Sequence, residues 1–151
     1  NLAKVTTVTI DTWAKCLIAT PGSRLYIKAL ALFSSTTKER FYSRFEERGI
    51  NRARIELAPR VDTIQEHLSL YAGVDIALDT FPYNGTTTTF EALWMGVPVI
   101  TLIGQRHAAR VGSSIIIRLG LKDLVAENYS DFVRQASGLA SNKNKHENYV
   151  T

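Results

Sequence analysis

Apolar residues alternate between helical and strand-like spacings along this chain. The first set recurs at intervals of three and four residues, as on one face of a helix, and comprises Ile10, Trp13, Ala14, Leu17 and Ile18. Pro21-Gly22 ends this helix, and a short strand starts at Leu25 and continues toward Leu32. The change of spacing predicts a strand that follows a helix and packs against it.

Two capping-box spacings mark further helix starts. Thr36 precedes Glu39 by three positions, and Thr63 precedes Glu66 by the same interval. We expect one helix from Thr36 to Gly49 and a short second helix that carries His67.

The second half of the chain repeats the alternation of strands and helices. Strands are predicted at 54–57, 74–78 and 97–103, and helices at 86–96, 111–119 and 131–139, with Ser130 as the cap of the last one. The run 97–103 is apolar almost throughout, which is typical of a strand buried on both faces of a parallel sheet. We therefore expect an α/β fold, a Rossmann-like parallel sheet flanked by helices, over residues 1–140, with a flexible tail over residues 141–151.

Composition narrows the class of protein. The 151 residues are 45% hydrophobic and 21% charged, as in a globular protein, and no apolar run approaches the length of a membrane span. The net charge of +4 comes from dispersed basic residues, so we expect no nucleic-acid partner. The single Cys16 indicates a reducing compartment, which we take as the cytoplasm, and the missing initiator Met indicates part of a longer protein.

Residues 74–96 carry the clearest chemical signal. An apolar strand runs into a turn with Asn84 and Gly85, and the threonines 86–89 then begin a helix. The first N–H groups of a helix lack partners within it, so they can bind a phosphate, helped by the hydroxyl groups of Thr86, Thr87 and Thr88. Gly85 lets the backbone approach a ligand closely. The alternative is that one threonine caps the helix and the others have no ligand role.

Three further side chains fit the same site. Glu91 lies one helical turn after Thr87 and could accept hydrogen bonds from a ribose diol, or it could simply favour the helix dipole. His67 lies on a helix that starts at the carboxyl end of another strand, so it could line the same cleft, although a lone His is more often structural. Lys4 could reach a phosphate as a point charge, whereas its local sequence alone indicates a surface residue.

The motifs of several common sites are absent from the sequence. Neither a glycine-rich dinucleotide fingerprint nor a P-loop occurs, and no nucleophile elbow is present. His107 and His146 have no partners at metal-ligand spacing, so no metal site is predicted.

Three segments of the chain resemble the C-terminal catalytic lobe of O-GlcNAc transferases. They are Asp79-Thr80-Phe81-Pro82-Tyr83-Asn84-Gly85 with the threonine row, Glu91-Ala92-Leu93-Trp94-Met95-Gly96, and the later Arg110-Val111-Gly112. The resemblance is greatest to the bacterial and SPINDLY-like relatives, which carry tetratricopeptide (TPR) repeats, and it extends from Asn1 to about Leu139. It implies the second lobe of a GT-B glycosyltransferase, beginning just after that lobe's first strand and lacking the closing helices.

The resemblance also assigns roles to single residues. Lys4 matches the lysine that neutralises the UDP diphosphate, which makes it the expected catalytic electrostatic group. The other matched positions are nucleotide- or phosphate-binding and comprise Asn1, His67, Thr86, Thr87, Thr88 and Glu91, beside Gly85. Thr86 stands in place of a histidine, Ile64 in place of a lysine and Leu70 in place of an arginine of the animal enzymes.

These observations lead to one hypothesis and its alternatives. The chain is expected to bind a nucleotide-sugar donor, UDP-GlcNAc, without a metal or cofactor, as part of an inverting enzyme that transfers GlcNAc to Ser or Thr of a protein. The acceptor protein would bind to other parts of the parent, so the isolated chain is expected to be inactive. The departures at Thr86, Ile64 and Leu70 leave the base and the sugar of the donor undecided, so GDP-fucose is also a candidate donor. A lobe of a GT-B epimerase and a non-catalytic Rossmann-like interaction module remain the alternatives.

Overall fold

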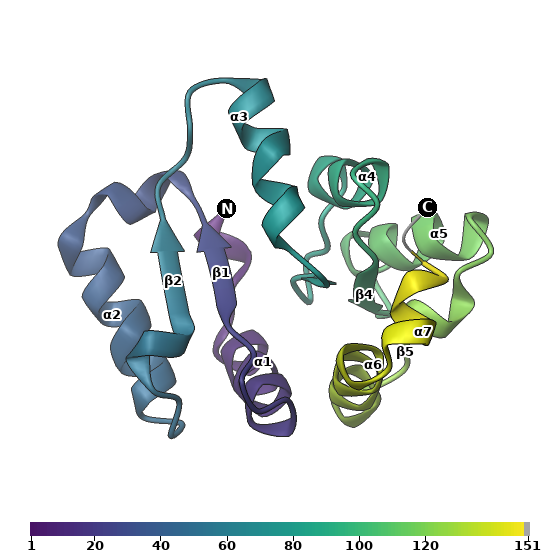
Figure 1. Ribbon diagram of the computed structural model, residues 1–151, viewed down its shortest axis with the longest axis horizontal. Helices are drawn as coiled ribbons and strands as arrows, with labels where there is room; N and C mark the ends of the chain where they lie inside the picture. Colours follow the sequence, from purple (N-terminus) through teal and green to yellow (C-terminus); the bar gives the residue numbers. More distant parts are fainter. Residues whose placement is uncertain (150–151) are drawn as a thin grey trace.

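The computed structural model describes residues 1–149 as short parallel sheets flanked by helices (Figure 1). The strands are β1 (Leu25–Lys28), β2 (Ile55–Ala58), β3 (Ala77–Leu78), β4 (Val99–Leu102) and β5 (Val125–Ala126). The α-helices are α1 (Thr7–Ala19), α2 (Ser35–Glu46), α3 (Ile64–Ser69), α4 (Thr87–Trp94), α5 (Val111–Arg118), α6 (Tyr129–Ser141) and α7 (Lys143–Glu147). The 3-10 helices are η1 (Leu2–Lys4), η2 (Leu30–Phe33), η3 (Arg52–Arg54), η4 (Leu70–Gly73), η5 (His107–Ala109) and η6 (Lys122–Leu124).

All strand pairs are parallel, which confirms the α/β class. β1 pairs with β2, and β4 lies between β3 and β5. Within the described residues, the predicted parallel strands form two separate sheets, one of two strands and one of three. The predicted strand 74–78 shortens to Ala77–Leu78, the strand from Leu25 gives way to η2 at Leu30, and β5 was not predicted. Strand pairing depends on contacts between distant segments, so hydrophobic spacing does not encode it.

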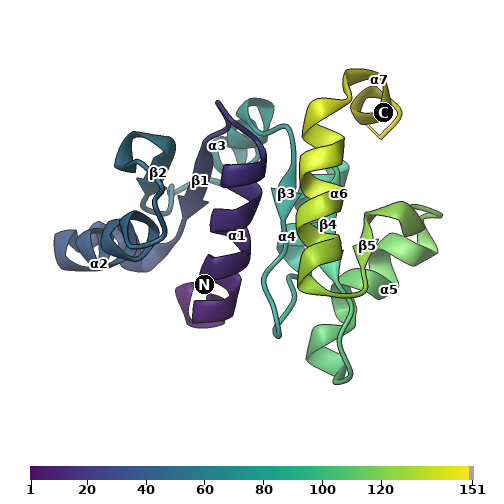
Figure 2. The same cartoon turned by 90° about the horizontal axis from the view of Figure 1, so that it is seen from below.

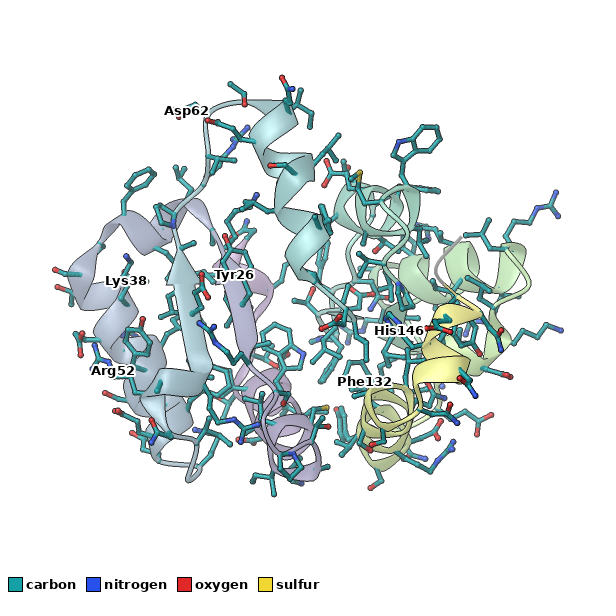
Figure 3. All side chains as sticks on the ribbon, in the orientation of Figure 1. Tyr26, Lys38, Arg52, Asp62, Phe132 and His146 are labelled. Carbon is teal, nitrogen blue, oxygen red and sulfur yellow. The ribbon has the colours of Figure 1, made fainter. Side chains whose placement is uncertain are left out.

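Helices cover both faces of the sheet that contains β4. α1 and α6 lie side by side on one face, whereas α4 and α5 contact β4 from the other (Figure 2). Every residue of β4 is buried, which agrees with its apolar sequence. Phe132 on α6, labelled in Figure 3, is fully buried in the core formed between these layers. The packed layers thus form the frame from which the loops after β3 and β4 project.

Most of the apolar face predicted for helix α1 is confirmed. Ile10, Trp13, Ala14 and Leu17 are buried, but Ile18 is 60% exposed and its placement on that face was wrong. The helix begins at a capping box in which Thr6 and Thr9 exchange side-chain and backbone hydrogen bonds. Thr9 is also buried and donates from its hydroxyl to the carbonyl oxygen of Phe81 at 2.8 Å. The start of α1 therefore anchors the loop after β3.

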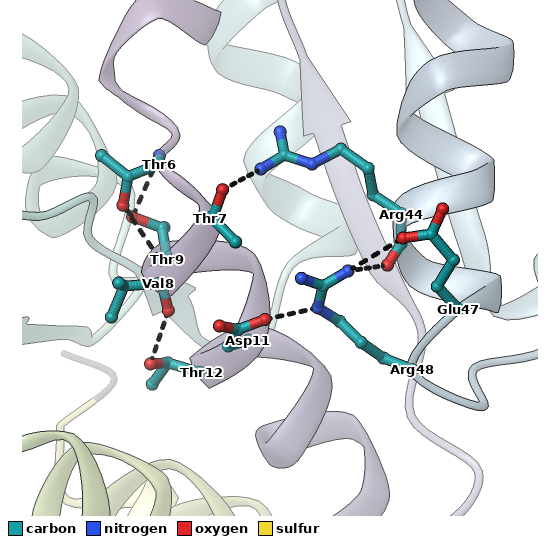
Figure 4. A network of polar contacts seen from close by, with 9 residues as sticks. All are labelled: Thr6, Thr7, Val8, Thr9, Asp11, Thr12, Arg44, Glu47 and Arg48. Atoms are coloured by element: carbon teal, nitrogen blue, oxygen red, sulfur yellow. Dashed lines mark hydrogen bonds and ion pairs between the residues drawn. The ribbon is translucent and has the colours of Figure 1, made fainter.

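Polar contacts join α1 to α2 (Figure 4). Arg48 Nε donates to Asp11 Oδ1 at 2.5 Å, and Arg44 donates to the hydroxyl of Thr7 at 3.2 Å. Together with the buried Phe41 and Phe45 of α2, these bonds hold α2 against α1.

The capping residues were only partly predicted. Thr63 and Glu66 form the predicted capping box of α3. The predicted caps Thr36 and Ser130 were wrong, because Ser34 caps α2 and Asn128 caps α6. Both true caps are nearby polar residues whose side chains accept from the N–H three positions later, and sequence spacing does not distinguish such neighbours. In α2, Glu39 forms an ion pair with Arg52 instead of a capping box.

The chain continues as helix beyond the predicted end of the lobe. α6 extends to Ser141 and α7 follows, with His146 Nε2 2.7 Å from the carbonyl oxygen of Asp75 (Figure 3). The mobility of the tail over 141–151 stays a prediction, and residues 150 and 151 lie outside the described part of the chain. Within residues 1–149, no helix has the length and apolar character needed to cross a membrane.

Candidate functional site

A cavity of about 240 Å³ lies at the end of β3, beside the start of α4. Its lining residues come from η1, η4, the strands β3 and β4 and the first turns of α4, and comprise Asn1, Lys4, Tyr71, Ala77, Leu78, Asp79, Thr80, Gly85, Thr88, Thr89, Ala92 and Val99. Four predicted site residues therefore meet here, namely Asn1, Lys4, Gly85 and Thr88. The position at the carboxyl end of a parallel strand is the one at which α/β sheets bind ligands.

Lys4 lies in this cavity because η1 turns the chain just before α1. The Asn1 side chain caps η1 by accepting from the N–H of Ala3 at 3.0 Å. Lys4 Nζ donates to the carbonyl oxygen of Asn84 at 2.9 Å and lies 4.1 Å from the centre of the Tyr83 ring. Both partners are neutral, so these contacts fix the ammonium group without cancelling its charge.

Buried hydrogen bonds shape the loop between β3 and α4. Asp79 Oδ1 accepts from the N–H groups of Gly85 at 2.7 Å and Thr80 at 2.8 Å. Its Oδ2 accepts from the hydroxyl of Thr101 at 2.7 Å. The fully buried Asn84 donates from Nδ2 to the carbonyl oxygen of Thr80 at 2.9 Å. These bonds set the backbone path that presents the carbonyl oxygen of Asn84 to Lys4.

The electrostatics of Asp79 are unusual. Burial raises the pKa of its carboxyl from 3.8 to about 6, although the hydrogen bonds from Gly85, Thr101 and Thr80 and the charge of Lys4 lower it. Only 7% of Asp79 is exposed, so burial is the dominant cause.

The threonine row begins α4 as predicted. No side chain caps this helix, so its first N–H groups are available to a ligand, and Thr86, Thr87 and Thr88 are exposed. A Cβ on Gly85 would lie 2.7 Å from the hydroxyl oxygen of Thr88, which explains glycine there. Thr86 lines a second cavity of about 340 Å³ between α4 and α5, and Thr87 lines neither of these cavities.

His67 and Glu91 lie together, beside the cavity and not in its lining. His67 Nε2 is 2.8 Å from Glu91 Oε2, and Lys28 at the end of β1 contacts His67 Nδ1 through its ammonium group. Tyr71 joins this group to the threonine row, because its ring packs edge-on against His67 and its hydroxyl lies 3.5 Å from the carbonyl oxygen of Thr88. Burial, with the charge of Glu91, raises the pKa of Tyr71 to about 12, so its hydroxyl stays neutral at physiological pH.

Three residues of this region were missed as functional candidates from the sequence. Asp79 directly follows β3 and Lys28 ends β1, so both occupy the carboxyl ends of strands, a signal that could have identified them. Tyr71 follows His67 by four positions, which places both on one helical face.

Gly112 in the first turn of α5 supports the loop from behind. A Cβ there would lie 2.4 Å from Asp79 Oδ2 and 2.5 Å from the hydroxyl oxygen of Thr101. Both neighbours are buried, so they have little room to move. We expect Gly112→Ala to lower the free energy of unfolding, measured by urea denaturation, by about 1–3 kcal/mol.

Gly138 on the exposed side of α6 is the matched control. A Cβ there would meet no atom within 4 Å, so Gly138→Ala is expected to stabilise the chain by about 0.5–1 kcal/mol. Equal effects of the two substitutions would contradict the close packing of Gly112 against Asp79.

Within 1–149, no group of three or more His, Cys, Asp or Glu side chains is placed to hold a metal ion.

Comparisons with known proteins indicate the family of this chain. The family described as glycosyl transferase family 41 matches residues 1–150. An Arabidopsis thaliana protein described as a probable UDP-N-acetylglucosamine–peptide N-acetylglucosaminyltransferase, SPINDLY, is 42% identical over 93% of this chain and 15% of its own length. The corresponding Caenorhabditis elegans transferase is 33% identical over 93% of this chain and 12% of its own.

A solved structure gives the same assignment. A mutant of the Thermobaculum terrenum O-GlcNAc transferase matches with a TM-score of 0.88 and 40% identity, over 93% of this chain and 27% of that one. The present chain thus spans only a minor part of each of these relatives. The family matches nearly the whole length of the chain, and these relatives agree with that match. The chain therefore belongs to glycosyl transferase family 41.

Proposed function

We propose that this chain is the donor-binding part of a protein O-glycosyltransferase that moves GlcNAc from UDP-GlcNAc to Ser or Thr. One observation carries the proposal: the ammonium group of Lys4 and the uncapped start of α4 converge on one cavity through Lys4, Gly85 and Thr88. A fixed cation beside a helix N-terminus is suited to a diphosphate. Family membership and the names of the relatives favour this activity over the epimerase and the non-catalytic module.

The proposed chemistry follows from these charges. An acceptor hydroxyl attacks the anomeric carbon of the sugar and releases its proton to water, the bond from that carbon to the diphosphate oxygen breaks, and UDP leaves. Negative charge grows on the departing diphosphate, and Lys4 with the N–H groups of α4 stabilises it. These groups would serve in place of a divalent cation. Glu91 would bind the ribose, while Asn1 and His67 complete the nucleotide site.

Partners and compartment belong to the same proposal. The protein acceptor would be held by other parts of the parent, so the 151-residue chain should bind donor and transfer nothing. The cytoplasm is the proposed compartment, supported by Cys16, which is a buried free thiol.

Titration of the chain with UDP, followed by amide chemical shifts, tests the donor site. We expect the largest shifts at Gly85, Thr88 and Lys4, which line the cavity. Shifts confined to other regions, with the threonine row unaffected, would refute the assignment. A competition between UDP and GDP then decides the base, which the exposed Ile64 on α3 leaves open.

A further inference from the structure

Three side chains from separate elements contact one another in series, next to the helix that begins with the threonine row. Lys28 ends β1, His67 lies on α3 and Glu91 lies on α4. The Lys28 ammonium group contacts His67 Nδ1, and His67 Nε2 lies 2.8 Å from Glu91 Oε2. The His67 and Glu91 side chains are only 23% and 19% exposed, so solvent competes little for these contacts.

The direction of the hydrogen bonds follows from the donors. A lysine ammonium group has only donors, so His67 Nδ1 must accept from Lys28. A neutral imidazole then carries its proton on Nε2, which donates to the carboxylate of Glu91. Lys28 therefore selects the tautomer of His67 that can hold Glu91. The Tyr71 ring, with its centre 5.6 Å from that of His67, restricts rotation of the imidazole.

Within residues 1–149, Glu91 uses only one of its two carboxylate oxygens for a hydrogen bond. Oε2 is engaged by His67, and Oε1 forms no hydrogen bond within the described part of the chain. A carboxylate held at one oxygen presents the other in a fixed direction, which favours binding of a hydroxyl group because less side-chain freedom is lost. The hydroxyl partner expected here is the ribose diol of the donor.

We propose that Lys28 is a positioning residue for the ribose of the donor: through the tautomer of His67 it fixes Glu91 as the acceptor for a ribose hydroxyl. The inference rests on the proposed function, since it takes Glu91 as the ribose ligand. Lys28 itself need not touch the nucleotide. Its effect should therefore depend on the diol and not on the diphosphate.

The first test needs no nucleotide. Imidazole ¹⁵N chemical shifts of His67 are measured in the unliganded chain at about pH 8, above the ordinary imidazole pKa. The wild type should show the Nε2–H tautomer, Lys28→Met a mixture of both tautomers, and Lys28→Arg the wild-type pattern. Lys15→Met, which removes an exposed charge on α1, should change nothing. An unchanged tautomer in Lys28→Met would overturn the inference.

The second test separates ribose from phosphate. Calorimetric affinities are compared for UDP and its 2′,3′-dideoxy analogue in the wild type and in Lys28→Met. We expect the substitution to weaken UDP binding by about three- to tenfold, less than the full loss of a hydrogen bond to a charged group because Glu91 itself is kept, and to leave the dideoxy analogue nearly unaffected. Equal losses for both nucleotides would overturn the ribose role. A wild type that binds no UDP would instead refute the proposed function, and the ribose role with it.

Discussion

Replacing Lys4 with Met is expected to weaken UDP binding by about tenfold to a hundredfold, since a hydrogen bond to a charged group contributes about 1.5–3 kcal/mol. Lys4 is held by the carbonyl oxygen of Asn84 and the Tyr83 ring, neither of which carries charge. Its ammonium group is therefore positioned before the ligand arrives, so it needs little reorientation to attract a diphosphate. Methionine keeps an unbranched apolar side chain and loses the charge.

Calorimetric titration with UDP and with uridine measures this effect. Uridine lacks the diphosphate, so Lys4→Met should leave its affinity unchanged, and higher salt should reduce the loss seen for UDP. Lys15→Met is the control of equal charge change, because Lys15 is exposed on α1, and it should bind UDP like the wild type. Equal losses of UDP affinity in both variants would mean that net charge, and not the position of Lys4, attracts the nucleotide.

The parts of the fold predicted from the sequence are those set by local patterns. The apolar face of α1, the capping box of α3 and the glycines that end α4 and α5 depend on residues within a few positions of one another. Gly96 and Gly120, for example, have φ angles of +75° and +79°, which favour glycine. Such features follow from backbone preferences and periodicity, so one sequence suffices.

The parts that were missed depend on contacts between distant segments. The division of the strands into separate sheets and the pairing of β5 with β4 are not encoded in any single window of sequence. The start of α4 at the threonine row follows from local sequence. The contact of Lys28 with His67 does not, because it joins residues 39 positions apart. Burial of Asp79 likewise arises from Thr101 and Gly112, which follow it on other elements.

Asp79→Ala is expected to be the most destabilising substitution in the loop. It leaves the N–H groups of Gly85 and Thr80 and the hydroxyl of Thr101 without their acceptor. Leaving buried donors unsatisfied should lower the free energy of unfolding by about 2–5 kcal/mol. Asp79→Asn is the matched variant, because its carbonyl oxygen can still accept from both N–H groups and its amide can donate to Thr101 Oγ1.

The same carboxyl makes stability depend on pH. Because burial raises the pKa of Asp79 from 3.8 to about 6, the folded chain binds this proton more tightly than the unfolded chain does. The associated stability is fully present below about pH 4 and is lost as the pH rises through about 6, a decrease of about 3 kcal/mol. Asp79→Asn cannot titrate and should lack this decrease.

Urea denaturation of the wild type and Asp79→Asn across this range isolates the contribution, because every other titrating group is common to both. The free energy of unfolding of the wild type should fall relative to that of Asp79→Asn as the pH increases. A difference that is constant with pH would show that Asp79 is solvated in the folded chain.

Ionisation of Asp79 should also weaken nucleotide binding. Asp79 lines the same cavity as Lys4, so its negative charge opposes an incoming diphosphate. UDP affinity of the wild type should then weaken through about pH 6 more than that of Asp79→Asn, a comparison that cancels titration of the nucleotide itself.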